Sequence, residues 1–122
     1  MKTNWLASCV AAPLAFGLVF RNLQAVWSSP AMAVPKEDSF RLVSEYKAVN
    51  EQVKSSGVTP NQEADMVDLL STRFFGNLDL LQGYRQMPLA EEAREMFTRT
   101  TPLGLFTPTR VLQGVLNATA YF

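Results

Sequence analysis

The chain has 122 residues, of which 48% are apolar and 18% are charged, a composition typical of one globular domain with a modest core. Eleven Lys and Arg residues balance eleven Asp and Glu residues, so the sequence lacks the basic excess usual in a protein that binds nucleic acid by itself. There is no His and a single Cys, Cys9. These counts exclude an intrachain disulfide, a His- or Cys-rich metal site, and catalysis of the Ser/His/Asp or Cys/His type.

The first twenty residues resemble a targeting segment in their pattern. Lys2 is followed by an almost uninterrupted apolar run that begins at Trp5, as in the charged and apolar regions of a secretory signal. The run is slightly short for a membrane span and contains Pro13. Two interpretations stay open: residues 1–15 are a signal-like or fused lead, or they form an ordinary packed helix. Residues 16–122 form the second segment.

A β-hairpin with a polar tip is predicted for residues 31–46. Residues 31–34 and 40–46 have the pattern of short strands, and residues 35–39 that of a turn. Side chains alternate between the two faces of a strand. One face is therefore expected to carry Phe40, Leu42, Ser44 and Tyr46, and the other Arg41, Val43 and Glu45.

A helix is predicted to begin at Thr59-Pro60, with Thr59 as the N-cap and Gln62 closing a capping box. Its apolar stripe is Met66, Leu69 and Leu70, and its end is expected near Ser71-Thr72. The acidic residues of this stretch are expected to form a solvated face instead of a metal cluster.

Residues 74–81 are predicted to form a buried strand, which Gln82-Gly83 then breaks. Asp79 lies inside this apolar stretch. A buried carboxylate is costly unless it is paired or binds a cation, so Asp79 is either hydrogen-bonded to backbone at a strand end or a metal ligand at the mouth of a sheet. This stretch alone favours the first interpretation.

The last third of the chain predicts a charged turn or short helix over residues 89–95 and paired strands over residues 97–101 and 103–108. The final block, residues 114–122, is apolar and helix-like. Together these elements predict an α+β fold of antiparallel hairpins with two or three helices.

Three stretches, in this order along the chain, resemble reverse transcriptases of Ty3/gypsy-type LTR retrotransposons. Ser29–Asn50 resembles the fingers segment, whose usual pattern is SPV…KKDG…WR…VDYR.LN. LDLLQGYRQMPL (Leu78–Leu89) resembles the first catalytic-aspartate motif, and Gly104–Phe122 resembles the segment FTR.P.G..NAPATFQ. The resemblance covers the chain from about Phe16 onward. It implies a partial fingers and palm fold in which the second half of the palm is missing.

The resemblance also implies the site residues. Asp79 matches the aspartate that coordinates the two divalent cations, Mg²⁺ in the family, and Tyr84 matches the aromatic gate against the ribose 2′-hydroxyl. Lys36 and Arg41 match residues that grip the triphosphate, and Gln113 matches one that contacts the nucleotide. The departures from the pattern are Glu45 for Asp, Lys47 for Arg, Arg85 for His or Trp, and Leu112 for Pro.

The function implied is RNA-directed DNA polymerisation, with RNA/DNA template–primer and dNTP as partners of the intact family. The YxDD-type hairpin with the other two aspartates is not in this sequence, and two-metal phosphoryl transfer needs several carboxylates. We therefore expect the chain alone to be inactive, to bind Mg²⁺ weakly or not at all, and to hold nucleic acid and dNTP unstably. An unpaired apolar sheet edge would make it prone to self-association.

Two other functions stay open. One is a small secreted or membrane-associated interaction protein that uses the apolar lead. The other is a subunit that complements a separate palm fragment in trans. A polymerase fragment would be cytoplasmic or nuclear, whereas a working signal would send the chain out of the cell.

Overall fold

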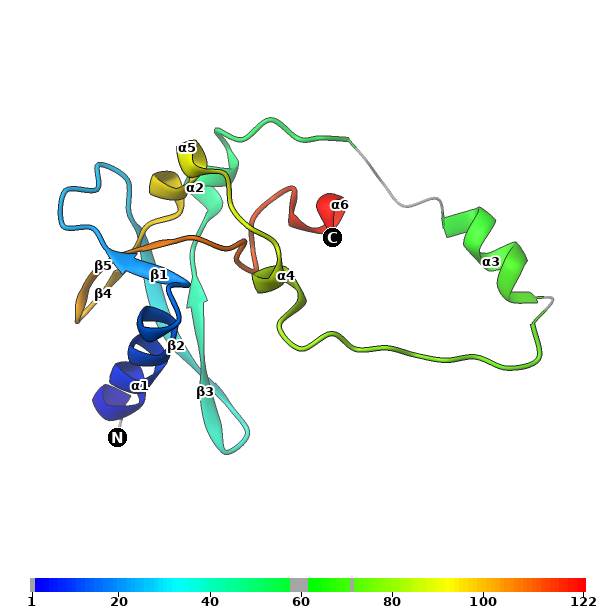
Figure 1. Ribbon diagram of the computed structural model, residues 1–122, viewed down its shortest axis with the longest axis horizontal. Helices are drawn as coiled ribbons and strands as arrows, with labels where there is room; N and C mark the ends of the chain where they lie inside the picture. The colour runs from blue at the N-terminus through cyan, green and yellow to red at the C-terminus, as the bar shows by residue number, and fades with distance from the viewer. Residues whose placement is uncertain (1, 58–61, 71) are drawn as a thin grey trace.

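The computed structural model describes residues 2–57, 62–70 and 72–122. Figure 1 shows a body built around one sheet and an arm that extends from it. The arm comprises residues 62–70 and 72–81. The strands are β1 (Val19–Arg21), β2 (Ser29–Lys36), β3 (Ser39–Ser44), β4 (Arg99–Thr101) and β5 (Gly104–Pro108). The helices are α1 (Lys2–Ala15), α2 (Lys47–Asn50), α3 (Gln62–Leu70), α4 (Gly83–Gln86), α5 (Glu91–Arg94), the 3₁₀ helix η1 (Glu95–Phe97) and α6 (Ala118–Tyr121).

The five strands form one mixed sheet in the order β1-β5-β4-β2-β3. The predicted hairpin is confirmed: β2 and β3 pair antiparallel over six positions, from Ala31 opposite Ser44 to Lys36 opposite Ser39. The junction of β2 with β4 is parallel and short, because only Ser29 and Pro30 take part. The outer part of the hairpin consequently projects beyond the sheet (Figure 1).

The predicted strand pair in the last third of the chain is also confirmed. β4 and β5 pair antiparallel from Arg99 opposite Phe106 to Thr101 opposite Gly104. Gly104 has φ of 121°, a conformation that favours glycine at this tight turn. Phe97, expected at the start of the first strand, instead ends η1.

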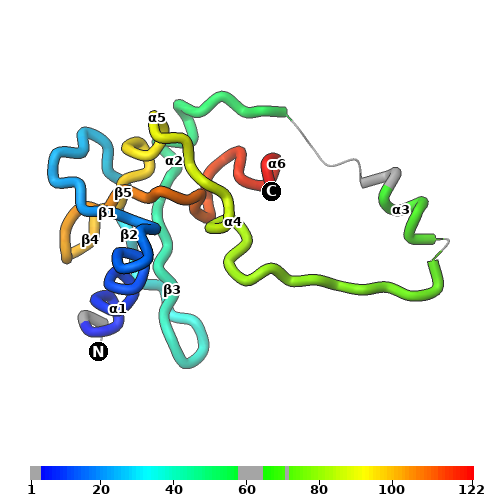
Figure 2. Tube along the Cα trace, viewed as in Figure 1, coloured from blue at the N-terminus to red at the C-terminus, as the bar shows by residue number. Residues whose placement is uncertain are grey.

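One small core lies between α1 and the sheet. Val10 of α1, Val19 of β1 and Phe106 of β5 are all buried and pack together. Figure 2 shows α1 running beside the β2–β3 hairpin. This is the arrangement expected of an ordinary packed helix, and a targeting role for these residues stays a prediction. Among the described residues, no helix has the length and apolar character needed to cross a membrane.

A second core joins the end of the hairpin to the last third of the chain. Its buried members are Tyr46, Val49, Leu89, Phe97 and Leu112. Residues 89–95, predicted to form a charged turn or a short helix, contain the short helix α5. The final block is helical only over α6, since Gly114, with φ of 99°, sits in a turn before it.

The predicted arm helix is confirmed as α3, although its proposed cap, Thr59-Pro60, lies outside the described residues. Figure 1 shows α3 well away from the body. Its apolar stripe is therefore not packed: Met66 is 62% exposed and Leu70 is 86% exposed.

The predicted buried strand over residues 74–81 is wrong. These residues are extended but unpaired, and Phe74 and Leu78 are 90% and 92% exposed. Asp79, expected to be buried, is exposed. The physical reason is that a strand needs neighbouring strands to satisfy its backbone and cover its side chains, and none of the described strands pairs with this segment.

Candidate functional site

A cavity of about 270 Å³ lies where the arm rejoins the body. It is lined by Leu78, Asp79, Leu80, Gly83, Tyr84 and Phe122. Two of the five residues predicted from the sequence, Asp79 and Tyr84, are therefore brought together at one hollow.

A tight turn sets the direction of Tyr84. Gln82 adopts a left-handed conformation, with φ of 50° and ψ of 45°, and its carbonyl accepts a hydrogen bond of 2.8 Å from the Arg85 amide. Its side-chain Oε1 accepts another, of 2.9 Å, from Arg85 Nη1. The predicted break at Gln82-Gly83 is thus the point where the extended segment turns into α4.

Tyr84 is half-buried and held from two sides. Its ring centroid lies 5.3 Å from that of Phe122, with the planes at 61°, and its hydroxyl lies 3.2 Å from Thr119 Oγ1. Gly83 makes room for this arrangement, because a Cβ there would lie 2.5 Å from Cζ of Phe122. The ring of Tyr84 is thereby fixed as one wall of the cavity.

Asp79 offers one carboxylate to the same cavity. Mg²⁺ is bound by oxygen ligands in octahedral geometry and keeps several waters, so an exposed aspartate fits as one of its ligands. Within the described ranges, no group of three or more His, Cys, Asp or Glu residues is placed to hold a metal ion. The single carboxylate of Asp79 is a smaller donor set than Mg²⁺ usually takes from a protein and its substrates.

Lys36 and Arg41 lie together elsewhere, on one face of the hairpin. Arg41 pairs with Val34, two residues before Lys36 on β2, and side chains two apart share a face. Both are exposed, and the predicted alternation is confirmed, since Phe40 and Leu42 on the other face are half-buried. Neither cation lines the cavity of Asp79.

Gln113 is exposed in the loop between β5 and α6, next to the buried Leu112. The loop is held by Asn50, a residue that sequence reasoning did not single out. Asn50 Nδ2 donates a 2.8 Å hydrogen bond to the Gly114 carbonyl, and its Oδ1 accepts one of 3.0 Å from the Leu116 amide. The available signal was its place at the end of the family-like stretch Ser29–Asn50.

Arg99 is a buried cation that no pattern in the sequence indicated. Arg99 of β4 is only 7% exposed, and its Nε has no hydrogen-bond partner. The pKa of its guanidinium is lowered, chiefly because the group is buried. Interaction with Tyr46 opposes this shift, the charge of Arg85 adds to it, and Cys9 opposes it. No pattern points to such a residue, because arginine is rarely buried without a partner.

No family model matches the chain. The curated relatives it matches include retrovirus-related Pol polyproteins from two Drosophila melanogaster transposons. For transposon gypsy the identity is 30% over 112 residues, 85% of this chain and 11% of the relative. For transposon 412 it is 29% over 97 residues, 73% of this chain and 8% of the relative. The chain thus spans about a tenth of the length of these relatives.

The fold matches that of solved foamy viral protease-reverse transcriptases. A foamy viral protease-reverse transcriptase in complex with double-stranded DNA superposes with a TM-score of 0.80 at 24% identity, covering 98% of this chain and 25% of that one. A second such complex gives a TM-score of 0.79 at 25% identity, over 98% of this chain and 21% of the other. The predicted α+β fold of a reverse-transcriptase segment is confirmed by these matches.

Proposed function

Because the chain belongs to the reverse-transcriptase family of gypsy-type retroelements, we propose that it is the fingers and front-palm segment of an RNA-directed DNA polymerase. The observation that supports this most directly is the cavity shared by Asp79 and Tyr84. In this proposal the cavity receives the sugar of an incoming nucleotide, and Asp79 supplies one ligand to the catalytic cations.

Lys36 and Arg41 would bind the triphosphate. They share an exposed face of the hairpin, so both can approach one polyanion from the same side. The guanidinium of Arg41 can donate two parallel hydrogen bonds to phosphate oxygens, and the ammonium of Lys36 acts as a mobile point charge.

Tyr84 would discriminate against a ribose. Its ring is fixed by Phe122 and Thr119, so it cannot easily yield space to a 2′-hydroxyl. Gln113, on the exposed loop held by Asn50, would contact the nucleotide.

Asp79 would hold Mg²⁺, which when bound supplies charge stabilisation to phosphoryl transfer. One carboxylate is too few to hold two cations. We therefore propose that the remaining ligands come from a polypeptide segment outside these 122 residues, joined to them or supplied in trans. The 122-residue chain alone is proposed to be inactive and to hold template–primer and dNTP unstably.

Primer extension tests this proposal. The 122-residue chain with Mg²⁺ or Mn²⁺ should give no extension, whereas the same residues placed in a gypsy-type polymerase, replacing its matching segment, should support it. In that chimera Asp79→Asn should abolish extension, and Asp65→Asn, at an exposed acid of α3, should not. Robust extension by the isolated chain would refute the proposed inactivity. A chimera indifferent to Asp79→Asn would refute the role of that aspartate.

We also propose that the isolated chain self-associates through the arm. Large apolar side chains are exposed there at Leu70 (86%), Phe74 (90%), Leu78 (92%) and Leu81 (86%), and extended apolar backbone without a partner tends to pair with another chain. Sedimentation velocity should reveal concentration-dependent association, weakened by Phe74→Ser with Leu78→Ser. Leu23→Ser, at a site 76% exposed outside the arm, is the control. Equal association of all three proteins would contradict the proposal.

A cytoplasmic or nuclear location is part of the proposal. Mass spectrometry of the N-terminus tests it. An intact terminus on a product inside the cell supports the location, and a terminus between Ala25 and Ala33 in the culture medium supports the secreted alternative instead.

A further inference from the structure

The outer part of the β2–β3 hairpin has little support from the sheet. β2 meets β4 at Ser29 and Pro30, and beyond them, within the described ranges, β2 and β3 pair only with each other. A two-stranded ribbon is at best marginally stable by itself. Lys36 and Arg41 lie on this outer part, so their positions depend on whatever else contacts it.

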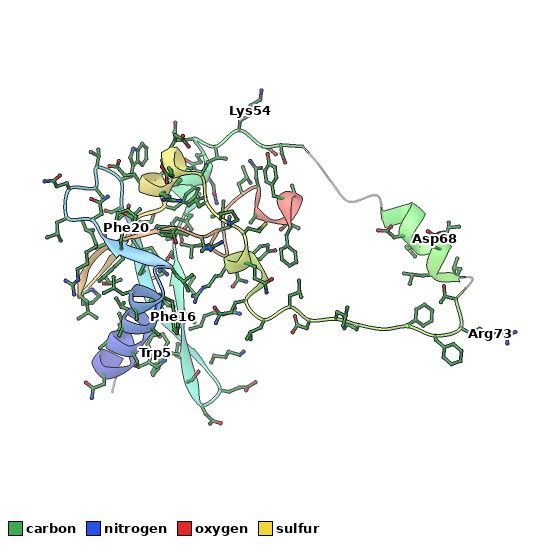
Figure 3. The ribbon with its side chains drawn as sticks, viewed as in Figure 1. Trp5, Phe16, Phe20, Lys54, Asp68 and Arg73 are labelled. Carbon is green, nitrogen blue, oxygen red and sulfur yellow. The ribbon has the colours of Figure 1, made fainter. Side chains whose placement is uncertain are left out.

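Helix α1 provides such a contact. The ring of Trp5 lies against that of Phe40, with centroids 5.4 Å apart and planes at 55°. Both side chains are half-buried. Figure 3 labels Trp5 on α1, on the side where the hairpin runs, and Figure 2 shows the helix and the hairpin next to each other.

The other end of α1 is anchored in the body. Val10 is buried against Val19 and Phe106. The Leu18 amide donates a 2.8 Å hydrogen bond to the Pro13 carbonyl, and Thr109 Oγ1 donates one of 2.8 Å to the Gly17 carbonyl. The helix therefore connects the core of the sheet to the outer hairpin.

The contact falls on the face opposite the cations. Phe40 precedes Arg41 directly, and adjacent residues of a strand point to opposite faces. Lys36 shares the face of Arg41. Trp5 thus packs against the back of the hairpin and leaves its charged front open to solvent.

We propose that Trp5 is a positioning residue that braces the hairpin from behind and so holds Lys36 and Arg41 in place for the triphosphate. The bracing is independent of ligand, whereas the consequence for phosphate binding rests on the proposed function. The two parts can be measured separately.

Amide hydrogen exchange of the 122-residue chain tests the bracing. Trp5→Ala should speed exchange of the hairpin amides, residues 31–44, by about 3- to 10-fold, as expected for loss of an aromatic pair, with β1 and β5 unchanged. Trp5→Phe, which keeps a ring, should restore slow exchange. Phe40→Ala should have the effect of Trp5→Ala, and the double variant should add little to either. Trp27→Ala, at the other tryptophan, is the control and should leave the hairpin unchanged.

Titration with tripolyphosphate, monitored by NMR of the hairpin amides, tests whether Trp5 affects phosphate binding. This probe presents phosphate oxygens without base or sugar, and millimolar binding is sufficient for detection. Trp5→Ala should weaken binding several-fold and Trp5→Phe should restore it. Arg41→Gln and Lys36→Gln should weaken binding without changing hydrogen exchange.

A different result would contradict each part of the proposal. Hairpin exchange that is the same in Trp5→Ala and in the native sequence would overturn the bracing. Faster exchange with unchanged tripolyphosphate affinity would overturn the positioning role. Binding that is insensitive to both Arg41→Gln and Lys36→Gln would refute the phosphate grip of the proposed function, while the exchange data would still decide the bracing.

Discussion

Tyr46 and Phe97 contact each other in two ways. The Tyr46 hydroxyl donates a 3.1 Å hydrogen bond to the Phe97 carbonyl, and the two rings meet edge-on with centroids 5.4 Å apart. Both side chains are buried, at 2% and 4% exposure. This pair joins the end of the hairpin to η1, fifty-one residues later in the chain.

Tyr46→Phe should destabilise the fold while keeping the ring contact. The substitution removes the only hydroxyl of this pair and leaves a buried carbonyl without that donor, which costs about 1–3 kcal/mol. Urea denaturation measures the loss. Tyr121→Phe, at a side chain 74% exposed, should cost nothing measurable, and equal effects at the two sites would contradict the prediction.

The free energy of unfolding should fall at alkaline pH. Burial raises the pKa of the Tyr46 phenol above 10.0, against opposing effects of Ser44 and Arg99, and burial raises the pKa of the Cys9 thiol above 9.0. Both groups hold their protons more tightly in the folded chain, so their contribution is complete below pH 9.0 and is lost as pH rises through the folded pKa values. Urea denaturation between about pH 8 and about pH 11 should show the decline. The free energy of unfolding of Tyr46→Phe should decline less over this pH range. An identical decline in the variant and the native sequence would argue against Tyr46 as a source of the pH dependence.

Arg99→Met should stabilise the chain. The buried guanidinium has an unsatisfied Nε, and within the part of the chain that the structure describes the one salt bridge joins Arg94 to Glu91. Replacing buried ionic groups with apolar residues of similar volume is often neutral or stabilising, by about 1–4 kcal/mol, and here no described salt bridge is lost. Thermal or urea unfolding measures the gain. Arg73→Met, at an exposed site on the arm (Figure 3), is the control, and a loss of stability in Arg99→Met would show that Arg99 has a compensating partner.

Asn50→Ala should loosen the loop that carries Gln113. The amide of Asn50 makes two hydrogen bonds to the backbone of residues 114 and 116, each of which contributes about 0.5–1.5 kcal/mol. Hydrogen exchange should become faster at Leu116, whose amide loses its acceptor, with β1 and β5 unaffected. Asn22→Ala, which removes a side-chain hydrogen bond to Thr107, serves as the matched control because it lies away from this loop. Unchanged exchange at Leu116 would contradict the role assigned to Asn50.

The local elements and the family resemblance could be predicted from the sequence. The hairpin, the β4–β5 pair, α3 and α5 all lie where the residue patterns predicted, because turn residues and the alternation of side chains act over a few neighbouring positions. The alternation also placed the side chains of Arg41 and Phe40 on opposite faces of the hairpin. The pairing of Asp79 with Tyr84 at one cavity follows from their separation by a single turn.

Other features depended on contacts between distant residues. An apolar pattern around Asp79 predicted a buried strand, but burial requires a neighbouring strand, and the described residues provide none there. The interaction of Trp5 with Phe40 joins residues 35 positions apart, and the hydrogen bonds of Asn50 join residues 64 and 66 positions apart. The burial of Arg99 likewise depends on surrounding elements. The sequence by itself determined several local elements: the hairpin, the β4–β5 pair, α3 and α5. The tertiary structure alone decided which side chains these elements cover and that residues 74–81 do not pair as a strand, because burial and strand pairing are properties of the surrounding chain and not of the segment.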